Sequence, residues 1–153
     1  MPFIPQVHYR DSRAALHWLE EAFGFSTTLA IENAEGNLEH AEMSFGPDHF
    51  QLGAEWADPD QLGTAEMKSP RAIGGINTRG VELVFDADID SHCAQARAHG
   101  AAITQEPTDQ FYGARAYRAV DLEGHVWTFP RFYRELSNEE MAAASGLKIR
   151  DSL

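Results

Sequence analysis

Apolar residues recur at helical spacing in two segments of the chain. The first segment spans about residues 12–23 and the second about residues 89–99. In both, apolar residues three, four or seven positions apart form one stripe, which is typical of an amphipathic helix. An aspartate or serine able to cap the helix precedes each segment, and a glycine follows it. The pattern therefore predicts two helices with defined ends.

Alternation of apolar and polar residues predicts strands on both sides of each helix. One extended segment precedes each helix and three follow it, separated by turn sequences rich in Gly, Asn, Asp and Pro. The predicted strands are residues 4–9, 27–32, 38–45 and 49–52 in the first half and residues 81–85, 102–104, 114–120 and 125–129 in the second half. One strand–helix–three-strand unit thus occurs twice, about 77 residues apart.

This repeat predicts one α+β domain built from two βαβββ units. The units cover about residues 3–54 and 78–134. A linker rich in Asp, Gly and Pro occupies residues 55–77, and a tail occupies residues 135–153, with a helix expected near residues 138–144. The chain length of 153 residues suits a single domain.

Composition excludes several classes of partner. Twelve basic against twenty-four acidic residues give a net charge of −12, which repels nucleic acid and anionic membrane surfaces. No apolar run approaches the ~20 residues that span a bilayer, and the N-terminus lacks the pattern of a secretory signal. The single cysteine, Cys93, excludes an internal disulfide framework. The sequence therefore suggests a cytoplasmic protein without nucleic-acid or membrane partners.

Short motifs at the ends of the predicted elements resemble the vicinal oxygen chelate superfamily, most closely its glyoxalase/bleomycin-resistance-like proteins. They occur in the expected order within the repeat and together cover about residues 3–134. The matching stretches are Tyr9-Arg10-Asp11, Ala22-Phe23-Gly24-Phe25, Asp88-Ile89-Asp90, Tyr112-Gly113-Ala114-Arg115 and Asp121-Leu122-Glu123-Gly124-His125-Val126-Trp127. We read Arg115 as a residue that ties down its own loop.

The resemblance implies an architecture and an assembly. Each βαβββ module curls its strands into half of an open, U-shaped mixed sheet, with helices on the outer face and a ligand cavity on the concave face. Members of the superfamily commonly form dimers, and open sheet edges favour a covering partner. We therefore expect a homodimer, with a cavity formed either within one chain or between two chains.

Metal-using members of the superfamily hold a divalent ion on the first and last strands of each unit. In this chain those positions fall on Ile4, Gln51, Gly80 and Thr128, with Val81 replacing Gly80 if the register slips. Only Gln51 is a possible ligand there, and one neutral amide is a poor site for a metal ion. We therefore expect no metal cofactor.

Strand alternation predicts which polar side chains face the cavity. They lie on the side of each strand opposite the apolar residues that pack under the helices. The predicted ligand-binding residues are Gln6, His8, His40, Glu42, Gln51, Glu82 and Arg118, with the aromatic residues Trp56 and Tyr112 at the rim. We interpret His17, His92 and His99 as surface residues of the helices and His125 as a turn residue.

These residues favour a protein that binds a small organic molecule without metal. One alternative is a metal-dependent lyase, isomerase or dioxygenase with a rearranged site. Its ligands would come from His8, Glu42, Gln51 and Glu82, or from His8, His40 and His49. Another alternative is a metal-free enzyme with Glu42 or Glu82 as general base. The sequence leaves open whether the protein is an enzyme, and it identifies no substrate.

Overall fold

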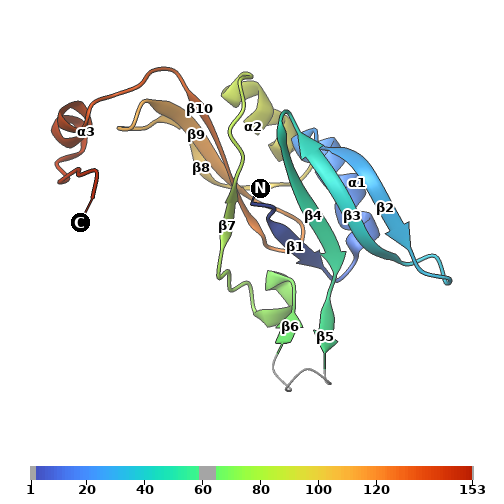
Figure 1. Cartoon of the computed structure of the whole chain (residues 1–153). Helices are drawn as coiled ribbons and strands as arrows, with labels where there is room; N and C mark the ends of the chain where they lie inside the picture. The colour runs from blue at the N-terminus through green and yellow to red at the C-terminus, as the bar shows by residue number, and fades with distance from the viewer. Residues whose placement is uncertain (1–2, 59–64, 153) are drawn as a thin grey trace.

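Two four-stranded mixed sheets, each covered by one helix, form the body of the chain (Figure 1). The computed structural model describes residues 3–58 and 65–152. The first module consists of β1 (Gln6–Tyr9), α1 (Ser12–Phe23), β2 (Ser26–Glu32), β3 (Leu38–Phe45) and β4 (Asp48–Ala54). The second module consists of β7 (Gly80–Glu82), α2 (Ile89–Ala98), β8 (Ala102–Asp109), β9 (Ala114–Val120) and β10 (Val126–Phe132). The expected α+β class with two βαβββ modules is confirmed.

The two sheets have the same topology. Their strand orders are β1-β4-β3-β2 and β7-β10-β9-β8. In each sheet the first strand pairs in parallel with the last strand, and the other neighbours are antiparallel. Equivalent positions of the two modules therefore follow directly from strand order and register.

The largest difference from the predicted strands is the length of β8, which continues to Asp109 instead of ending near residue 104. Polar residues occupy both faces of this strand, so it shows no alternation that sequence analysis can detect. Its register with β9 shifts between Ile103 and Gln105 and again before Thr108. Such irregularity is common in edge strands.

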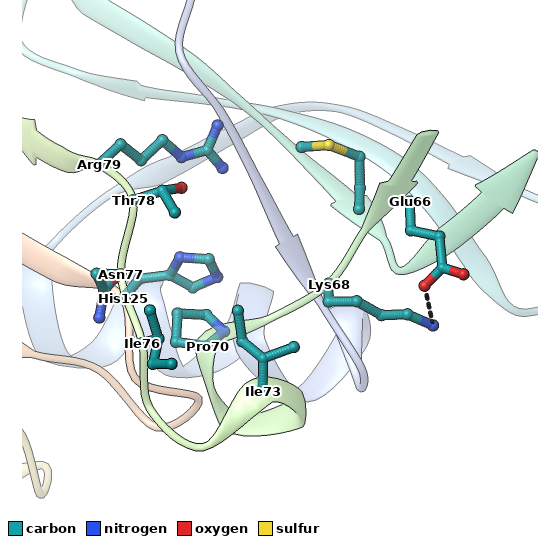
Figure 2. A pocket seen from close by; sticks show the side chains of 10 residues that line it. Glu66, Lys68, Pro70, Ile73, Ile76, Asn77, Thr78, Arg79 and His125 are labelled. Carbon is teal, nitrogen blue, oxygen red and sulfur yellow. Dashed lines mark ion pairs between the residues drawn. The ribbon is translucent and has the colours of Figure 1, made fainter. Parts of the chain in front are cut away.

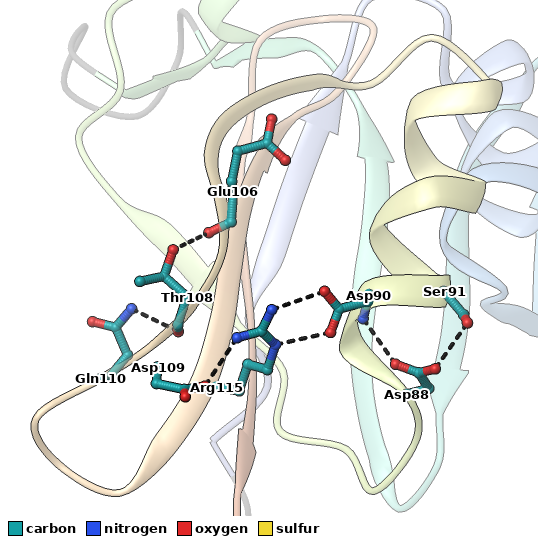
Figure 3. A network of polar contacts seen from close by, with 8 residues as sticks. All are labelled: Asp88, Asp90, Ser91, Glu106, Thr108, Asp109, Gln110 and Arg115. Carbon is teal, nitrogen blue, oxygen red and sulfur yellow. Dashed lines mark hydrogen bonds and ion pairs between the residues drawn. The ribbon is translucent and has the colours of Figure 1, made fainter.

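Arg115 joins the edge of the second sheet to the start of α2 (Figure 3). Its Nε and Nη2 atoms donate to the two carboxylate oxygens of Asp90 at 2.8 Å each. Its Nη1 atom donates to Asp109 at 2.9 Å. These ion pairs hold the pKa of Asp90 below its ordinary value. The structure therefore supports the structural role predicted for Arg115.

One aromatic core joins the two modules. Helices α1 and α2 pack against each other. At the end of α1, the Phe23 ring lies 5.8 Å from the Trp127 ring and 4.9 Å from the Phe129 ring, both on β10. The ring centroid of Phe25 lies 5.0 Å from that of Phe50 on β4 and 5.4 Å from that of Trp127. The helix-covered sides of the sheets are thus buried together in a continuous core.

His92 is half-buried and packs against this core, so its predicted position on the surface was wrong. Its Nε2 atom donates to the carbonyl oxygen of Phe23 at 2.8 Å, and its Nδ1 atom accepts from the hydroxyl of Tyr117 at 2.7 Å. Its ring lies 4.7 Å from that of Phe129. The reason is that α2 packs across the module boundary, where Phe23 of the other module covers this helix position. Burial lowers the pKa of His92.

The half-buried imidazole of His92 predicts a loss of stability in mild acid. The folded protein keeps His92 neutral, whereas the unfolded chain protonates it near pH 6.5. The unfolded state therefore binds more protons as the pH falls below 6.5, and the free energy of unfolding decreases. His8, whose pKa is also lowered, contributes in the same direction. Urea denaturation at pH 7.5 and pH 5.5 measures the effect.

A matched pair of variants assigns that pH dependence. His92→Gln removes one titrating group and should reduce the difference in unfolding free energy between the two pH values. His17→Gln removes an exposed histidine, with 63% of its side chain accessible, and should leave that difference unchanged. A wild-type protein that is equally stable at both pH values would contradict the assignment.

The linker between the modules contains regular structure that the sequence did not predict. Strands β5 (Trp56–Asp58) and β6 (Ala65–Met67) pair as an antiparallel ribbon, and a short 3₁₀ helix, η1, covers Pro70–Ile73. After the second module, α3 (Asn138–Ser145) has a capping box formed by Ser137 and Glu140, which confirms the expected tail helix. Residues 59–64 of the predicted linker and residue 153 of the predicted tail lie outside the described residues.

Within residues 3–58 and 65–152, no helix has the length and apolar character required to cross a bilayer.

Candidate functional site

The sheet faces opposite the helices carry two equivalent rows of polar residues. In the first sheet, the register places Gln51 of β4 between Gln6 of β1 and Glu42 of β3. In the second sheet, Thr128 of β10 lies between Glu82 of β7 and Arg118 of β9. Because the strand orders match, the two rows occupy corresponding places in their modules. All of the predicted strand residues except His8 and His40 lie in these rows.

Five of the nine predicted ligand-binding residues line one cavity of about 220 Å³ on the first sheet. The amide of Gln6 donates to the side-chain oxygen of Gln51 at 2.8 Å. The indole Nε1 of Trp56, which follows β4, donates to Nε2 of His8 at 3.3 Å. The lining residues are Gln6, His8, Glu39, His40, Gln51, Leu52, Gly53, Ala54 and Trp56. Glu39 and Gly53 were not predicted from the sequence.

His8 is far more buried than an alternating strand predicts, with 6% of its surface exposed. Because Nε2 accepts from Trp56, the ring proton lies on Nδ1, which is buried and has no hydrogen-bond partner among the described residues. Burial lowers the pKa of His8, and the charge of Arg79 lowers it further, so the ring is neutral near pH 7. It therefore offers hydrogen-bonding groups and no charge.

Gly53 makes room for the His8 ring. A Cβ atom at residue 53 would lie 3.2 Å from Cδ2 of His8, closer than ordinary packing allows. The two residues are opposite one another in the parallel pairing of β1 and β4. This role could not be predicted from the sequence, because nothing in the local pattern of β4 marks the glycine.

Glu42 lines a second, adjoining cavity of about 200 Å³. Its carboxylate lies 4.0 Å from Nε2 of His40, and Gln51 lines this cavity as well as the first. His49 also lines the second cavity and so lies beside Glu42, away from His8. The two cavities together form one polar surface on the first module, which we call the first polar surface.

Glu82, Tyr112 and Arg118 form a separate cluster on the second module. Burial raises the pKa of Tyr112, the charge of Glu82 raises it further and that of Arg118 opposes the change, so both charges lie near the phenol. Nε of Arg118 is 3.5 Å from the hydroxyl of Thr128. The cavities that hold the first group of predicted residues contain none of these three. The nine predicted residues therefore lie on two surfaces of one chain. Six line the cavities on the first module, and the other three, Glu82, Tyr112 and Arg118, form the second polar surface.

The register corrects the positions assigned to metal ligands. Donors on neighbouring parallel strands can share an ion only where they lie opposite each other, about 4.8 Å apart. Opposite Gln51 is Gln6 instead of Ile4, and opposite Thr128 is Glu82 instead of Gly80. The alignment was displaced by two residues in both modules; in the first, Ile4 lies before β1 begins at Gln6.

The corrected set does not suit a divalent ion. It contains one carboxylate, one hydroxyl and two amides, and the amides are hydrogen-bonded to each other. Among the residues that the structure describes, no three His, Cys, Asp or Glu side chains gather as a metal site. This donor chemistry disagrees with the metal site of the metal-using members.

A buried hydrogen-bond network fixes the strand that carries His8. Asp121 accepts from the hydroxyl of Tyr9 at 2.6 Å and from the indole of Trp127 at 2.9 Å. Glu123 accepts from the backbone amides at residues 10 and 11, at 2.8 and 2.9 Å. Nε2 of His125 donates to the carbonyl oxygen of His8 at 2.8 Å, which supports its predicted role as a structural turn residue. The β9–β10 turn thus anchors β1.

Comparison with solved structures shows similar folds over nearly the whole chain. TioX from Micromonospora sp. ML1 is 28% identical with a TM-score of 0.65, and the match covers 90% of this chain and 100% of TioX. TnmS3 from Streptomyces sp. CB03234, described as an antibiotic binding protein, is 18% identical with a TM-score of 0.56, and the match covers 87% and 98% of the chains.

A third similar structure is a glyoxalase/bleomycin resistance protein/dioxygenase family enzyme from Burkholderia phytofirmans PsJN. It is 19% identical with a TM-score of 0.57, and the match covers 84% of this chain and 95% of that chain. The likenesses to TnmS3 and to this enzyme show the fold alone. Comparison with curated protein sequences gave no significant match.

The family model of the Glyoxalase/Bleomycin resistance protein/Dioxygenase superfamily matches residues 6–129. This range begins with β1 and ends within β10, so it includes both modules and the linker. The sequence match, the duplicated βαβββ topology and the similar solved structures agree. The chain therefore belongs to the glyoxalase/bleomycin resistance protein/dioxygenase superfamily.

Proposed function

We propose that this protein binds a small organic molecule on its polar sheet faces, without a metal ion. The observation that carries the proposal is the convergence of Gln6, His8, His40, Gln51 and Trp56 on one cavity. Such convergence of a few polar groups and an aromatic wall is typical of ligand sites. The fold shared with TnmS3, described as an antibiotic binding protein, supports the same class of function.

The chemistry of the first polar surface favours a cationic, partly aromatic ligand. Trp56 is 44% exposed at the cavity edge and offers a ring face for stacking or for contact with a cation. Glu39 and Glu42 add negative charge beside it, whereas the neutral His8 adds none. The net charge of −12 also attracts cations to the molecule.

A second copy of the chain would complete this site. The cavity of about 220 Å³ is smaller than the ~300 Å³ or more of typical ligand pockets. The remaining predicted residues, Glu82, Tyr112 and Arg118, lie on the equivalent surface of the other module. We propose a homodimer in which the first polar surface of each copy faces the second polar surface of its partner. Light scattering should then give about twice the chain mass of 17.0 kDa.

The compartment proposed is the cytoplasm. Cys93, the one cysteine of the sequence, is buried, and burial raises its pKa, so the thiol is poorly reactive. An unreactive free thiol without a disulfide suits a reducing compartment. The acidic chain, in turn, does not suit nucleic acid as a partner.

A thermal-shift screen of cationic aromatic compounds in the presence of chelator tests the proposal. A ligand at ~100 times its dissociation constant adds about 2.7 kcal/mol to the free energy of unfolding, which raises the melting temperature by several degrees. Glu42→Gln should weaken the affinity of a hit about tenfold, because it removes a charge that faces the ligand. The measurement is titration calorimetry on each variant.

Glu35→Gln is the matched control. It makes the same charge change at an exposed turn position whose side chain lines neither cavity, and it should leave the affinity within about twofold. Hits that bind Glu42→Gln as tightly as wild type would contradict the placement of the ligand. Hits that appear only when a divalent metal replaces the chelator would contradict binding without metal.

A further inference from the structure

A third cavity, of about 380 Å³, lies in the linker region between the two modules (Figure 2). It shares no lining residue with the cavities on the first polar surface. Figure 2 shows Arg79 and Lys68 on opposite sides of it, with Pro70, Ile73 and Ile76 below them in this view. The lining residues are Glu66, Met67, Lys68, Pro70, Ile73, Ile76, Asn77, Thr78, Arg79 and His125.

Arg79 supplies a positive charge to this cavity that the described residues leave uncompensated. Arg97 and Arg115 each bind a carboxylate at 2.7–2.9 Å, and Arg131 binds one at 3.1 Å. Among residues 3–57 and 66–152, Arg79 has no ion pair. Partial burial lowers the pKa of its guanidinium, which remains charged near pH 7. The Arg79 side chain lines the cavity and is exposed there, so its guanidinium is free to pair with an anion that enters.

The other walls of the cavity define the rest of a ligand. Met67, Pro70, Ile73 and Ile76 provide an apolar surface opposite the charge. Lys68 adds a second cation, but Glu66 lies 3.7 Å from it and offsets its charge. Nε2 of His125 is already bonded to the carbonyl of His8, so its ring has a fixed orientation at the cavity wall. The walls thus combine one available guanidinium with an apolar surface.

We propose that this cavity is a second binding site, which takes an organic carboxylate with an apolar body. The planar guanidinium of Arg79 matches a carboxylate in a two-point hydrogen-bonded pair. The apolar wall would cover the body of the ligand, and the volume is large enough for a bicyclic aromatic ring system. This site binds the opposite charge to the one proposed for the polar sheet faces, and it goes beyond that function.

Calorimetry with 2-naphthoate and its uncharged analogue 2-naphthamide tests the proposal on the full chain. We expect 2-naphthoate to bind at least tenfold more tightly than 2-naphthamide. Arg79→Gln should weaken 2-naphthoate binding at least tenfold and leave 2-naphthamide unchanged. Arg79→Lys, which keeps the charge and loses the planar fork, should give an intermediate affinity.

Arg71→Gln is the matched control. Arg71 belongs to η1 beside the cavity, but its side chain does not line it. This variant changes the net charge as Arg79→Gln does and should keep 2-naphthoate affinity within about twofold of wild type. Equal binding of acid and amide, equal binding by wild type and Arg79→Gln, or no binding of 2-naphthoate would each overturn the proposal. The result is separate from that of the thermal-shift screen. Glu42→Gln, which tests the site on the polar sheet faces, replaces no residue that lines this cavity.

Discussion

Replacing Asp121 by alanine is expected to lower the free energy of unfolding by at least about 3 kcal/mol. The carboxylate accepts four hydrogen bonds in the buried interior. Two come from the side chains of Tyr9 and Trp127, and two come from the backbone amides at residues 123 and 125. Alanine leaves buried donors without partners, and each such group costs about 1–3 kcal/mol. Chemical denaturation monitored by tryptophan fluorescence measures the loss.

Asp86→Ala is the control for that measurement. Asp86 also accepts from an arginine, but 93% of its side chain is exposed, so the variant should change stability by no more than about 0.5 kcal/mol. Tyr9→Phe, alone and combined with Asp121→Ala, gives the coupling energy between these two side chains, which belong to different modules, in a double-mutant cycle. Equal stability losses for Asp121→Ala and Asp86→Ala would show that the network does not hold the modules together.

A mixed dimer of two variants that have each lost ligand binding should recover it. One chain carries His40→Ala with Glu42→Gln on the first polar surface, and the other carries Glu82→Gln with Arg118→Ala on the second. Each variant alone alters both sites of its own dimer and should lose ligand affinity at least 100-fold. In the mixed dimer the two unaltered surfaces face each other at one site. That dimer should therefore bind with wild-type affinity at about half of its sites.

Two different affinity tags on co-expressed chains isolate the mixed dimer, and calorimetry with a ligand from the screen gives its stoichiometry. The four replaced side chains are partly or fully exposed in a single chain, so folding should be preserved. If each site lay within one chain, both chains of the mixed dimer would remain defective and no binding would return. That result would contradict the shared site while leaving ligand binding itself intact.

Local patterns in the sequence determined most of the secondary structure. Helix α1 has the predicted bounds because its apolar stripe, the Asp11 cap and the left-handed Gly24 are encoded within one short segment. Strands β3 and β9 have the predicted bounds for the same reason, since alternation and turn residues define them. The doubled unit is visible in sequence because the same order of local signals occurs twice.

These local patterns could not predict the strand register or the packing between distant segments. The sequence placed polar residues on strand faces but could not show that Gln6 lies opposite Gln51, because the two are 45 residues apart and their alignment depends on the whole sheet. An error of two residues on β1 therefore displaced the predicted metal positions. The second half of β8, beyond the predicted residues 102–104, and the ribbon of β5 and β6 were missed because neither has a periodic pattern.

The sequence by itself thus determined the family, the α+β class, the repeated modules and the candidate polar residues. Only the tertiary structure decided which of those residues meet. It buried His8, half-buried His92 against the aromatic core, divided the candidate residues between two surfaces and placed the Arg79 side chain in a cavity. The physical reason is the separation along the sequence over which each effect acts. Periodicity and capping act within a few residues, whereas burial and charge pairing depend on contacts such as that of Tyr9 with Asp121, 112 residues away.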